Sequence, residues 1–272
     1  MLRFPRQRSG PPSVPELAPT LPDGRRCYAI GDVHGRLDLL RIALAAVRSD
    51  LVAHPIGRAF LVMLGDVIDR GPSSREVVEL LRTADWSGIT PVFLLGNHEE
   101  ALLAAYDGDL AALQSWTGFG GAETAQSYGV PSVLLLRDDW QGYWQAVRAA
   151  IPAEHIDFLR GFYDQFALGD YLFVHAGVRP GTPVDRQDPR DLRWIRDEFL
   201  RSRDDFGKVV VHGHTVSEAP EFLPNRIGID TGAYRTGMLT VLRLEGDEQR
   251  ILDLKAGGGG AAVSLASDAV SA

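Results

Sequence analysis

Residues 27–35 of the chain read CYAIGDVHG, a short apolar run that ends in a polar turn bounded by glycines. The same arrangement returns as AFLVMLGDVIDRG at residues 59–71 and as PVFLLGNHE at residues 91–99. YLFVHAG at residues 171–177 and KVVVHGHT at residues 208–215 complete the set. Apolar runs of this length beside glycine are typical of buried strands that end in tight loops. The pattern therefore predicts five strands whose ends carry polar side chains.

Segments with helical periodicity lie between these strands, most clearly at residues 37–47 and 74–81. The stretch 99–166 is mostly helical, with helices expected at 99–106, 109–115, 121–127, 139–149 and 153–165. RIGID, MLTVLRL and RILDL, which follow later, look like an antiparallel strand set. This alternation predicts a layered α/β domain with its site at the carboxyl ends of the strands and with 99–166 as an insertion beside that site.

The composition is that of a globular protein, with 45% hydrophobic and 24% charged residues in a chain of 272. We expect one domain at 23–255 between two flexible tails, a Pro- and Arg-rich one at 1–22 and a Gly- and Ala-rich one at 256–272. The formal net charge of −8 argues against nucleic acid as a partner, because an acidic surface repels a phosphate backbone.

The chain has a single cysteine, Cys27, so it cannot form an intramolecular disulfide. This suits the reducing cytoplasm, and we expect a cytoplasmic protein. No apolar run reaches the roughly 18 residues that a membrane-spanning helix needs, so no membrane partner is expected. The oligomeric state is left open.

Side chains that commonly bind metals gather at the predicted strand ends. The candidates are Asp32, His34, Asp66, Asn97, His175 and His214. Each one alone is explained more simply as a turn residue, a helix N-cap or an ordinary histidine. Ligand-type residues at five strand ends are poorly explained by chance, and mixed nitrogen and oxygen ligands suit metals such as Mn, Fe, Zn or Co. His54 and His155 stand outside this pattern and are expected at the surface.

The motifs GDVHG, GDVIDRG, GNHE, HAG and GHT, in this order, resemble those of the phosphoprotein phosphatase family of metallophosphoesterases. The likeness is greatest to the bacterial and bacteriophage lambda-type serine/threonine protein phosphatases, which also share an IDTGA segment like that at 229–233. The resemblance spans 31–233 and leaves out the tails and much of the insertion. It implies a calcineurin-like β-sandwich flanked by helices, in αββα layers, with the helical insertion beside the active site.

The resemblance implies two divalent metal ions, with manganese as the first choice and Fe, Zn, Co or Ni as alternatives. The first ion would be held by Asp32, His34 and Asp66, and the second by Asp66, Asn97, His175 and His214. A water bridging the two ions would attack phosphorus in line. His98 would act as the general acid that protonates the leaving group, and Asp69 would orient it.

Phosphate oxygens would be bound by Arg70, Asn97 and a second arginine, for which Arg196 in Trp194-Ile195-Arg196 is the best match and Arg193 the runner-up. The broader metallophosphoesterases close with Gly-His-x-His, but Val216 stands at the last position here. His212 is therefore expected to be structural rather than a ligand.

The activity implied is hydrolysis of phosphoserine and phosphothreonine in a phosphorylated protein, with phosphotyrosine or a small phosphorylated substrate also open. The leading alternative is a symmetrical diadenosine tetraphosphate hydrolase, although the intact Asp69-Arg70-Gly71 favours a phosphatase. A non-catalytic module ranks low because the expected ligands and His98 are all present. The segment 116–121, WTGFGG, would be either a substrate-specific lip or an ordinary interhelical loop.

Overall fold

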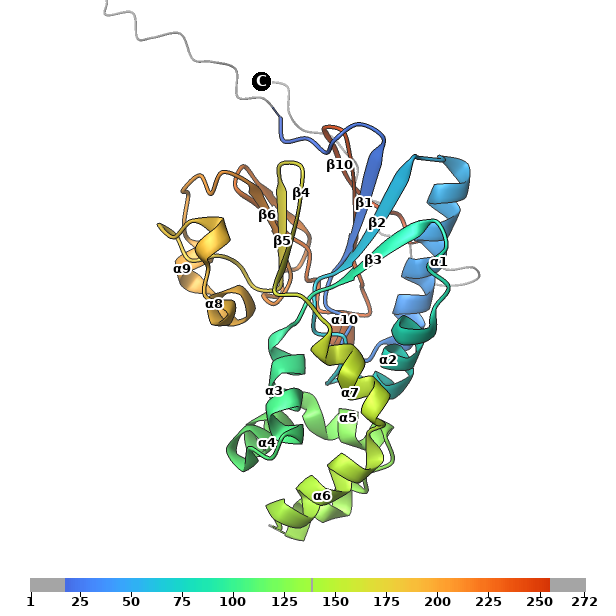
Figure 1. Ribbon diagram of the computed structural model, residues 1–272, viewed down its shortest axis with the longest axis vertical. Helices are drawn as coiled ribbons and strands as arrows, with labels where there is room; N and C mark the ends of the chain where they lie inside the picture. Colours follow the sequence, from blue (N-terminus) through green and yellow to red (C-terminus); the bar gives the residue numbers. More distant parts are fainter. Residues whose placement is uncertain (1–17, 138, 255–272) are drawn as a thin grey trace, which may run out of the picture.

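The computed structural model describes residues 18–137 and 139–254 of the chain, which fold into two β-sheets with helices around them (Figure 1). The first sheet has the strand order β10-β9-β1-β2-β3. Its strands are β1 (Arg25–Ile30), β2 (Arg58–Met63), β3 (Ile89–Phe93), β9 (Val241–Glu245) and β10 (Glu248–Ile251). β1, β2 and β3 run parallel, so their carboxyl ends meet at one edge of the sheet.

The second sheet has the strand order β4-β5-β6-β8-β7. Its strands are β4 (Gln165–Leu168), β5 (Tyr171–Val174), β6 (Val209–His212), β7 (Glu221–Leu223) and β8 (Arg226–Gly228). β5, β6 and β8 are parallel, whereas β4 and β7 pair antiparallel at the two edges. The carboxyl ends of β5 and β6 therefore also lie on one side.

The helices pack outside the sheets and at one end of them (Figure 1). They are α1 (Leu37–Ala53), α2 (Ser74–Thr83), α3 (Asn97–Tyr106), α4 (Leu110–Trp116), α5 (Ala122–Ser127), α6 (Trp140–Ala150), α7 (Ala153–Arg160), α8 (Pro189–Trp194), α9 (Asp197–Leu200) and α10 (Ala233–Thr236). Three short turns are a π-turn η1 (Thr117–Gly121) and the 3-10 turns η2 (Ser132–Arg137) and η3 (Val184–Arg186). No helix in the described ranges is both long and apolar enough to cross a bilayer.

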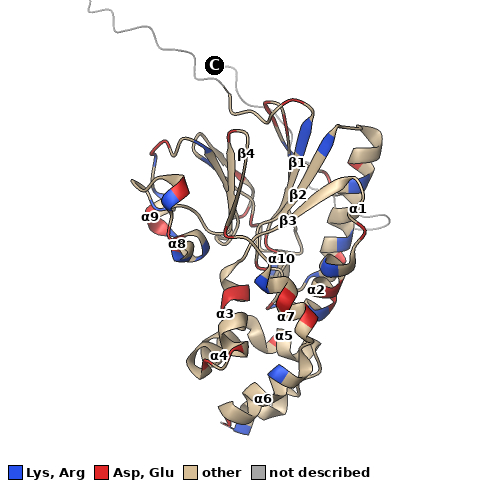
Figure 2. Ribbon diagram, in the orientation of Figure 1, with Lys and Arg blue, Asp and Glu red and all other residues tan. Residues whose placement is uncertain are grey.

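Buried side chains divide into three clusters that define the layers. Successive strand residues point to opposite faces, so Ala29 packs into the space between the sheets with Phe173, while Tyr28 packs against the α1 and α2 side. The outer face of the second sheet packs on Leu192 and Phe199 of α8 and α9. Charged residues lie mainly on the helices and loops and at the beginnings of β1 and β2 (Figure 2). The expected α/β sandwich with αββα layers is confirmed.

The helical insertion matches its expected helices except at its end. α3 to α7 occupy 97–160, but the helix expected at 153–165 ends at Arg160, where Gly161 follows, and Gln165–Leu168 forms β4. The apolar pattern alone does not show that this short run pairs with β5. The prediction that RIGID forms an antiparallel set with the two strands after it was also wrong. This segment contains β8, which lies in the second sheet and runs parallel to β6.

The N-terminal boundary also differs from the expectation. Residues 18–22 were assigned to a flexible tail, but Leu21 is buried and its N–H donates to Gly246 O at 2.8 Å. The Thr20 N–H donates to the Asp170 carboxylate at 2.9 Å. These contacts link the turn between β9 and β10 to the turn between β4 and β5, so the folded chain begins before residue 23. The rest of both expected tails, 1–17 and 256–272, lies outside the described residues.

Candidate active site

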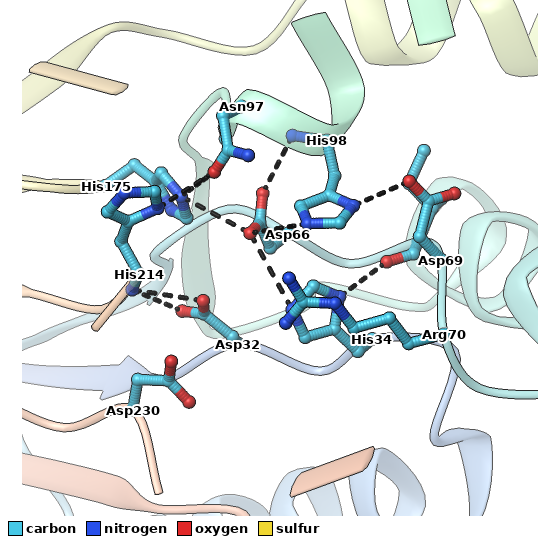
Figure 3. Close-up of polar contacts among 12 residues, drawn as sticks. Asp32, His34, Asp66, Asp69, Arg70, Asn97, His98, His175, His214 and Asp230 are labelled. Carbon is cyan, nitrogen blue, oxygen red and sulfur yellow. Dashed lines mark hydrogen bonds and ion pairs between the residues drawn. The ribbon is translucent and has the colours of Figure 1, made fainter. Parts of the chain in front are cut away.

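The loops that follow β1, β2, β3, β5 and β6 converge at one end of the sandwich (Figure 3). They bring together the six candidate ligands, all of them buried: Asp32, His34, Asp66, Asn97, His175 and His214. The first four come from the first sheet and the two later histidines from the second. The site therefore lies where the two sheets meet, with α3 and the insertion beside it.

The backbone at this site is held in unusual conformations. Among the described residues, a positive φ outside glycine occurs only at His34, Asp66, Asp69, Arg70 and His214. Such left-handed conformations cost about 1–3 kcal/mol each and persist only where the surroundings enforce them. The surroundings are tightly packed: a Cβ at Gly96 would lie 2.1 Å from the Asp66 carboxylate and 2.5 Å from the Asp66 backbone nitrogen. The strain is confined to residues that carry the candidate chemistry.

Two groups of potential metal ligands share one carboxylate. His34, Asp66 and His98 form the first group, and Asp66, His175 and His214 form the second. Within each group the ligand atoms lie within 4.8 Å of one another. Oδ2 of Asp66 lies 3.7 Å from His34 Nε2 in the first group and 3.4 Å from His175 Nε2 in the second, so this oxygen faces both groups.

The hydrogen bonds of the histidines fit a divalent cation. Nδ1 of His34 lies 2.8 Å from the Ile68 carbonyl, and Nδ1 of His175 lies 2.8 Å from the Leu64 carbonyl. A carbonyl can only accept, so each Nδ1 carries a proton and Nε2 is the nitrogen that a metal would take. Nε2 of His34 accepts from Arg70, whereas Nε2 of His175 lies 3.0 Å from Asn97 Oδ1, so on His175 a bound cation would replace a proton. Nε2 of His214 is buried and has no hydrogen-bond partner among the described residues. These nitrogens fit the metal that the sequence implies.

The buried histidines and carboxylates of the site also shift one another's pKa. Burial alone would lower the pKa of His175, but the carboxylates of Asp66 and Asp32 raise it to about 10. Burial would raise the pKa of Asp66, yet His175 and His98 hold it well below its ordinary value. Burial lowers the pKa of His34 to about 3, which keeps that imidazole neutral and able to ligate.

Asn97 and Asp32 take different places around these groups. The Asn97 Oδ1 lies 3.0 Å from His175 Nε2 and 2.9 Å from His214 Nδ1, at the centre of the second group. The Asp32 carboxylate lies outside both groups and accepts the His214 backbone N–H at 3.0 Å. Burial and the neighbouring Asp230 raise the pKa of Asp32. Its role as a ligand stays a prediction, and Asp230 is a site carboxylate to which the sequence motif gave no role.

His98 and Asp69 form a closed pair beside Asp66. Nδ1 of His98 lies 2.7 Å from Asp69 Oδ2, and both side chains are buried. The His98 Nε2 points toward Asp66 Oδ2 at 3.8 Å (Figure 3). Burial would lower the pKa of His98, but Asp66 and Asp69 outweigh it and raise it. The arrangement suits an imidazolium that gives up its Nε2 proton.

The three candidate arginines differ in how near they lie to the two ligand groups. Arg70 Nη1 lies 3.0 Å from His34 Nε2, and its guanidinium sits over the Tyr234 ring. Arg196 Nη1 lies 3.3 Å from Thr215 Oγ1, beside His214. Arg193 instead pairs with Glu100 and Asp164. The structure thus places Arg196 rather than Arg193 near the candidate ligands.

Glu99 is a site residue whose role the sequence did not reveal. Its buried carboxylate accepts the backbone N–H groups of Asp66 at 2.8 Å and Val67 at 2.8 Å, and also those of Ile68 and Gly96. It therefore ties the loop after β2 to the start of α3. Its place as the third residue of α3, typical of glutamates that reach back to a helix N-terminus, was an available signal.

The remaining histidines behave differently from one another. His54 is exposed, as expected. His155 was expected at the surface but is buried, with Nδ1 2.7 Å from the Tyr128 hydroxyl and Nε2 2.9 Å from Glu79. α7 packs this face against α2, which the local sequence does not show. His212 is buried against Phe199, away from both ligand groups.

A comparison with protein-family models matches residues 25–243 to the calcineurin-like phosphoesterases. The chain belongs to this family. The phosphoesterase is 25% identical over 235 residues to an asymmetrical bis(5'-nucleosyl)-tetraphosphatase of Anoxybacillus flavithermus, covering 79% of this chain and 88% of that one. It is thus a hydrolase of phosphoric esters whose His and Asp groups are positioned to bind metal.

Two solved structures share the fold of the phosphoesterase. One is a candidate diadenosine tetraphosphatase, with a TM-score of 0.58, 22% identity, and coverage of 86% of this chain and 97% of the other. The second is a mutant of a cold-active protein tyrosine phosphatase, with a TM-score of 0.57, 19% identity, and coverage of 86% and 83%. At these identities the likeness shows the fold alone, and the same fold carries both names.

Proposed function

We propose that this phosphoesterase is a two-metal hydrolase, with bis(5'-nucleosyl) tetraphosphates as its first substrate class. The observation that carries the two-metal chemistry is that Asp66 belongs to both ligand groups, while His98 of the first group also pairs with Asp69. Asp32 and His34 would complete the first metal site with Asp66. The second site would add three ligands to Asp66: Asn97, His175 and His214. Manganese is the first metal to test.

When bound, the ions would supply a nucleophilic water and neutralise developing negative charge. The protein's own groups would do the rest. Arg70 and Arg196 would bind phosphate oxygens through their planar forks, with Asn97 nearby. His98 would donate its Nε2 proton to the leaving oxygen, while Asp69 holds its Nδ1 and stabilises the charged ring. Cys27 is buried within the first sheet and takes no part.

The substrate order rests on the relatives and differs from the order that the motifs suggest. A relative that aligns over most of both chains is named for a bis(5'-nucleosyl) tetraphosphate, which supports a dinucleotide substrate. Phosphoprotein hydrolysis is the second candidate. It is supported by the complete Asp69-Arg70-Gly71 motif and by the buried acid pair, because an alkoxide leaving group needs a proton more than a phosphate leaving group does.

The test is a direct comparison of substrates on the full chain. The protein is stripped of metal, reloaded with Mn, Zn, Fe or Mg, and assayed on diadenosine tetraphosphate and on phosphoserine, phosphothreonine and phosphotyrosine peptides. We expect metal-dependent cleavage with the highest kcat/KM on the dinucleotide. Products of one tri- and one monophosphate would indicate asymmetrical cleavage, and two diphosphates symmetrical cleavage. Cleavage of the peptides alone would overturn the dinucleotide assignment.

A further inference from the structure

Two side chains of the helical insertion hold the carboxylate of Asp69. Trp116, the last residue of α4, donates its indole N–H to Asp69 Oδ2 at 2.9 Å and Oδ1 at 3.1 Å. Thr124, in α5, donates its hydroxyl to Oδ1 at 2.6 Å. All three side chains are fully buried. Asp69 lies 47 residues from Trp116 and 55 residues from Thr124 in the sequence, so only the fold brings it to them.

The segment between these two residues also touches the other candidate groups. The ring of Phe119 meets His98 edge-on, with 4.8 Å between ring centroids. The Gly120 carbonyl accepts the Arg70 N–H at 3.0 Å, and a Cβ at Gly120 would lie 2.7 Å from Arg70 Cγ. Phe119 and Gly120 leave the helical conformation inside the π-turn η1. Such turns are frequent at functional sites.

These contacts leave the Asp69 carboxylate one orientation. Trp116 donates to both oxygens and Thr124 to Oδ1, and in this orientation Oδ2 also meets Nδ1 of His98. A buried carboxylate cannot exchange a lost donor for bulk water, so removing either donor would let it rotate away from His98. Trp116 and Thr124 make their contacts with Asp69 and not with the ligand groups. Their action on the reaction would pass through Asp69.

We propose that Trp116 and Thr124 are positioning residues, which hold Asp69 so that it orients His98 toward the leaving group. The inference rests on the acid role of His98 in the proposed function. It also gives the insertion a part in the reaction, because Trp116, the first residue of 116–121, is buried against Asp69. The alternative of a substrate-specific lip for this segment stays a prediction.

The test uses substitutions that remove a hydrogen-bond donor; Thr124→Val keeps the side-chain volume, whereas Trp116→Phe also removes one ring, a loss that its control shares. Trp116→Phe removes the indole N–H, and Thr124→Val removes the hydroxyl with almost no change in volume. Thr124→Val leaves the Asp69 N–H a partner in the Ser74 hydroxyl, at 3.0 Å. The matched control is Trp144→Phe, because Trp144 lies in the same insertion and donates its N–H to the Tyr106 carbonyl. All variants are loaded with Mn and checked for metal content.

Rates are measured on diadenosine tetraphosphate, phenyl phosphate and p-nitrophenyl phosphate. We expect Trp116→Phe and Thr124→Val to lower kcat on phenyl phosphate by about tenfold or more, with little change in KM. The loss on p-nitrophenyl phosphate should be smaller, because its leaving group is less basic and needs the acid less. The control Trp144→Phe should keep wild-type rates. An equal loss on both aryl phosphates would point to a general structural defect and overturn the positioning role.

A double-mutant cycle with Asp69→Asn decides whether the effect passes through Asp69. We expect Trp116→Phe to cause no further loss once Asp69 is replaced, since residues that act as a unit are not additive. If Asp69→Asn lowers the rate and Trp116→Phe still causes its full loss in that variant, the positioning role is overturned while the proposed acid pair stands. Wild-type rates for Asp69→Asn would instead overturn the acid pair of the proposed function, and the positioning role with it.

Discussion

The imidazole of His98 has its Nδ1 on Asp69 at 2.7 Å and its Nε2 facing Asp66. This geometry fits a general acid, but His98 also belongs to the first ligand group. His98→Asn separates the two roles, because asparagine is polar but cannot deliver a proton. We expect turnover to fall by about 10²–10⁴-fold with both metal ions retained. Steady-state kinetics and metal analysis of the same sample would check this, and loss of one metal equivalent would make His98 a ligand instead.

Glu99 shapes the site through four backbone N–H groups and not through a metal. Glu99→Gln keeps the size of the side chain but turns an amide NH₂ toward donors that need an acceptor. We expect the free energy of unfolding to drop by about 2–4 kcal/mol, since buried backbone N–H groups that lose their acceptor are costly to leave unpaired. Urea denaturation at pH 7 would measure the drop. Glu100→Gln, at the neighbouring and more exposed position, is the control and should lose much less.

Individual site residues could be predicted from the sequence when they lie within a motif. Asp32, Asp66 and Asn97 each come directly after the glycine that ends an apolar run, so the sheet edge that gathers them follows from the strand pattern. Trp116 and Thr124 reach Asp69 only because the insertion folds back over the loop after β2. Nothing near them in the sequence indicates that contact, since it depends on the packing of α4 and α5.

The elements of the first sheet are tied to α1 by a buried ionic network. Asp50 of α1 accepts from Arg243 Nε of β9 at 3.0 Å and lies 3.3 Å from Arg26 Nη1 of β1. The Tyr28 hydroxyl also donates to it. Burial alone would raise the pKa of Asp50, but Tyr28, Arg243 and Arg26 together hold it below its ordinary value. The network thus favours the ionised carboxylate in the folded state.

Asp50→Asn should remove a pH-dependent part of the stability. A carboxyl whose pKa is lower in the folded state stabilises the fold above its unfolded pKa of about 3.9, and this stability is lost as the pH falls through the folded value. We expect Asp50→Asn to cost about 3 kcal/mol at pH 7, because it leaves buried arginines partly unpaired. The gap to wild type should narrow below about pH 4. Urea denaturation at pH 7 and pH 3.5 checks this, and a constant gap would contradict it.

Elements differ in how far local pattern determines them. The central parallel strands and α1 to α6 follow from apolar runs and helical periodicity, which are local properties. β4, β7 and β8 are three or four residues long, and their place is set by partners far along the chain. The helix predicted past Arg160 and the misplaced RIGID strand both arise from this dependence on long-range pairing.

The fold as a whole places the candidate metal ligands on both sheets. Asp66 follows β2 of the first sheet, whereas His175 and His214 follow β5 and β6 of the second. Ions held by these groups would join the two halves of the sandwich at one end. At the opposite end, Leu21 bonds to Gly246 of the first sheet's last turn and Thr20 bonds to Asp170 beside the second sheet, so these residues also connect the two halves. Metal binding should therefore stabilise the fold as well as support the reaction.

Because the ligands come together only in the folded chain, metal binds the native state and raises its stability by mass action. At a free ion concentration of 100 Kd the gain is about 2.7 kcal/mol, which in a chain of this size raises Tm by about 5–10 °C. Thermal melts of the metal-stripped and Mn-loaded protein would measure the shift. His175→Ala should lose most of it, whereas the exposed control His54→Gln should keep it. An equal shift in both variants would mean that manganese binds elsewhere and that Asp66 does not join two metal sites across the sheets.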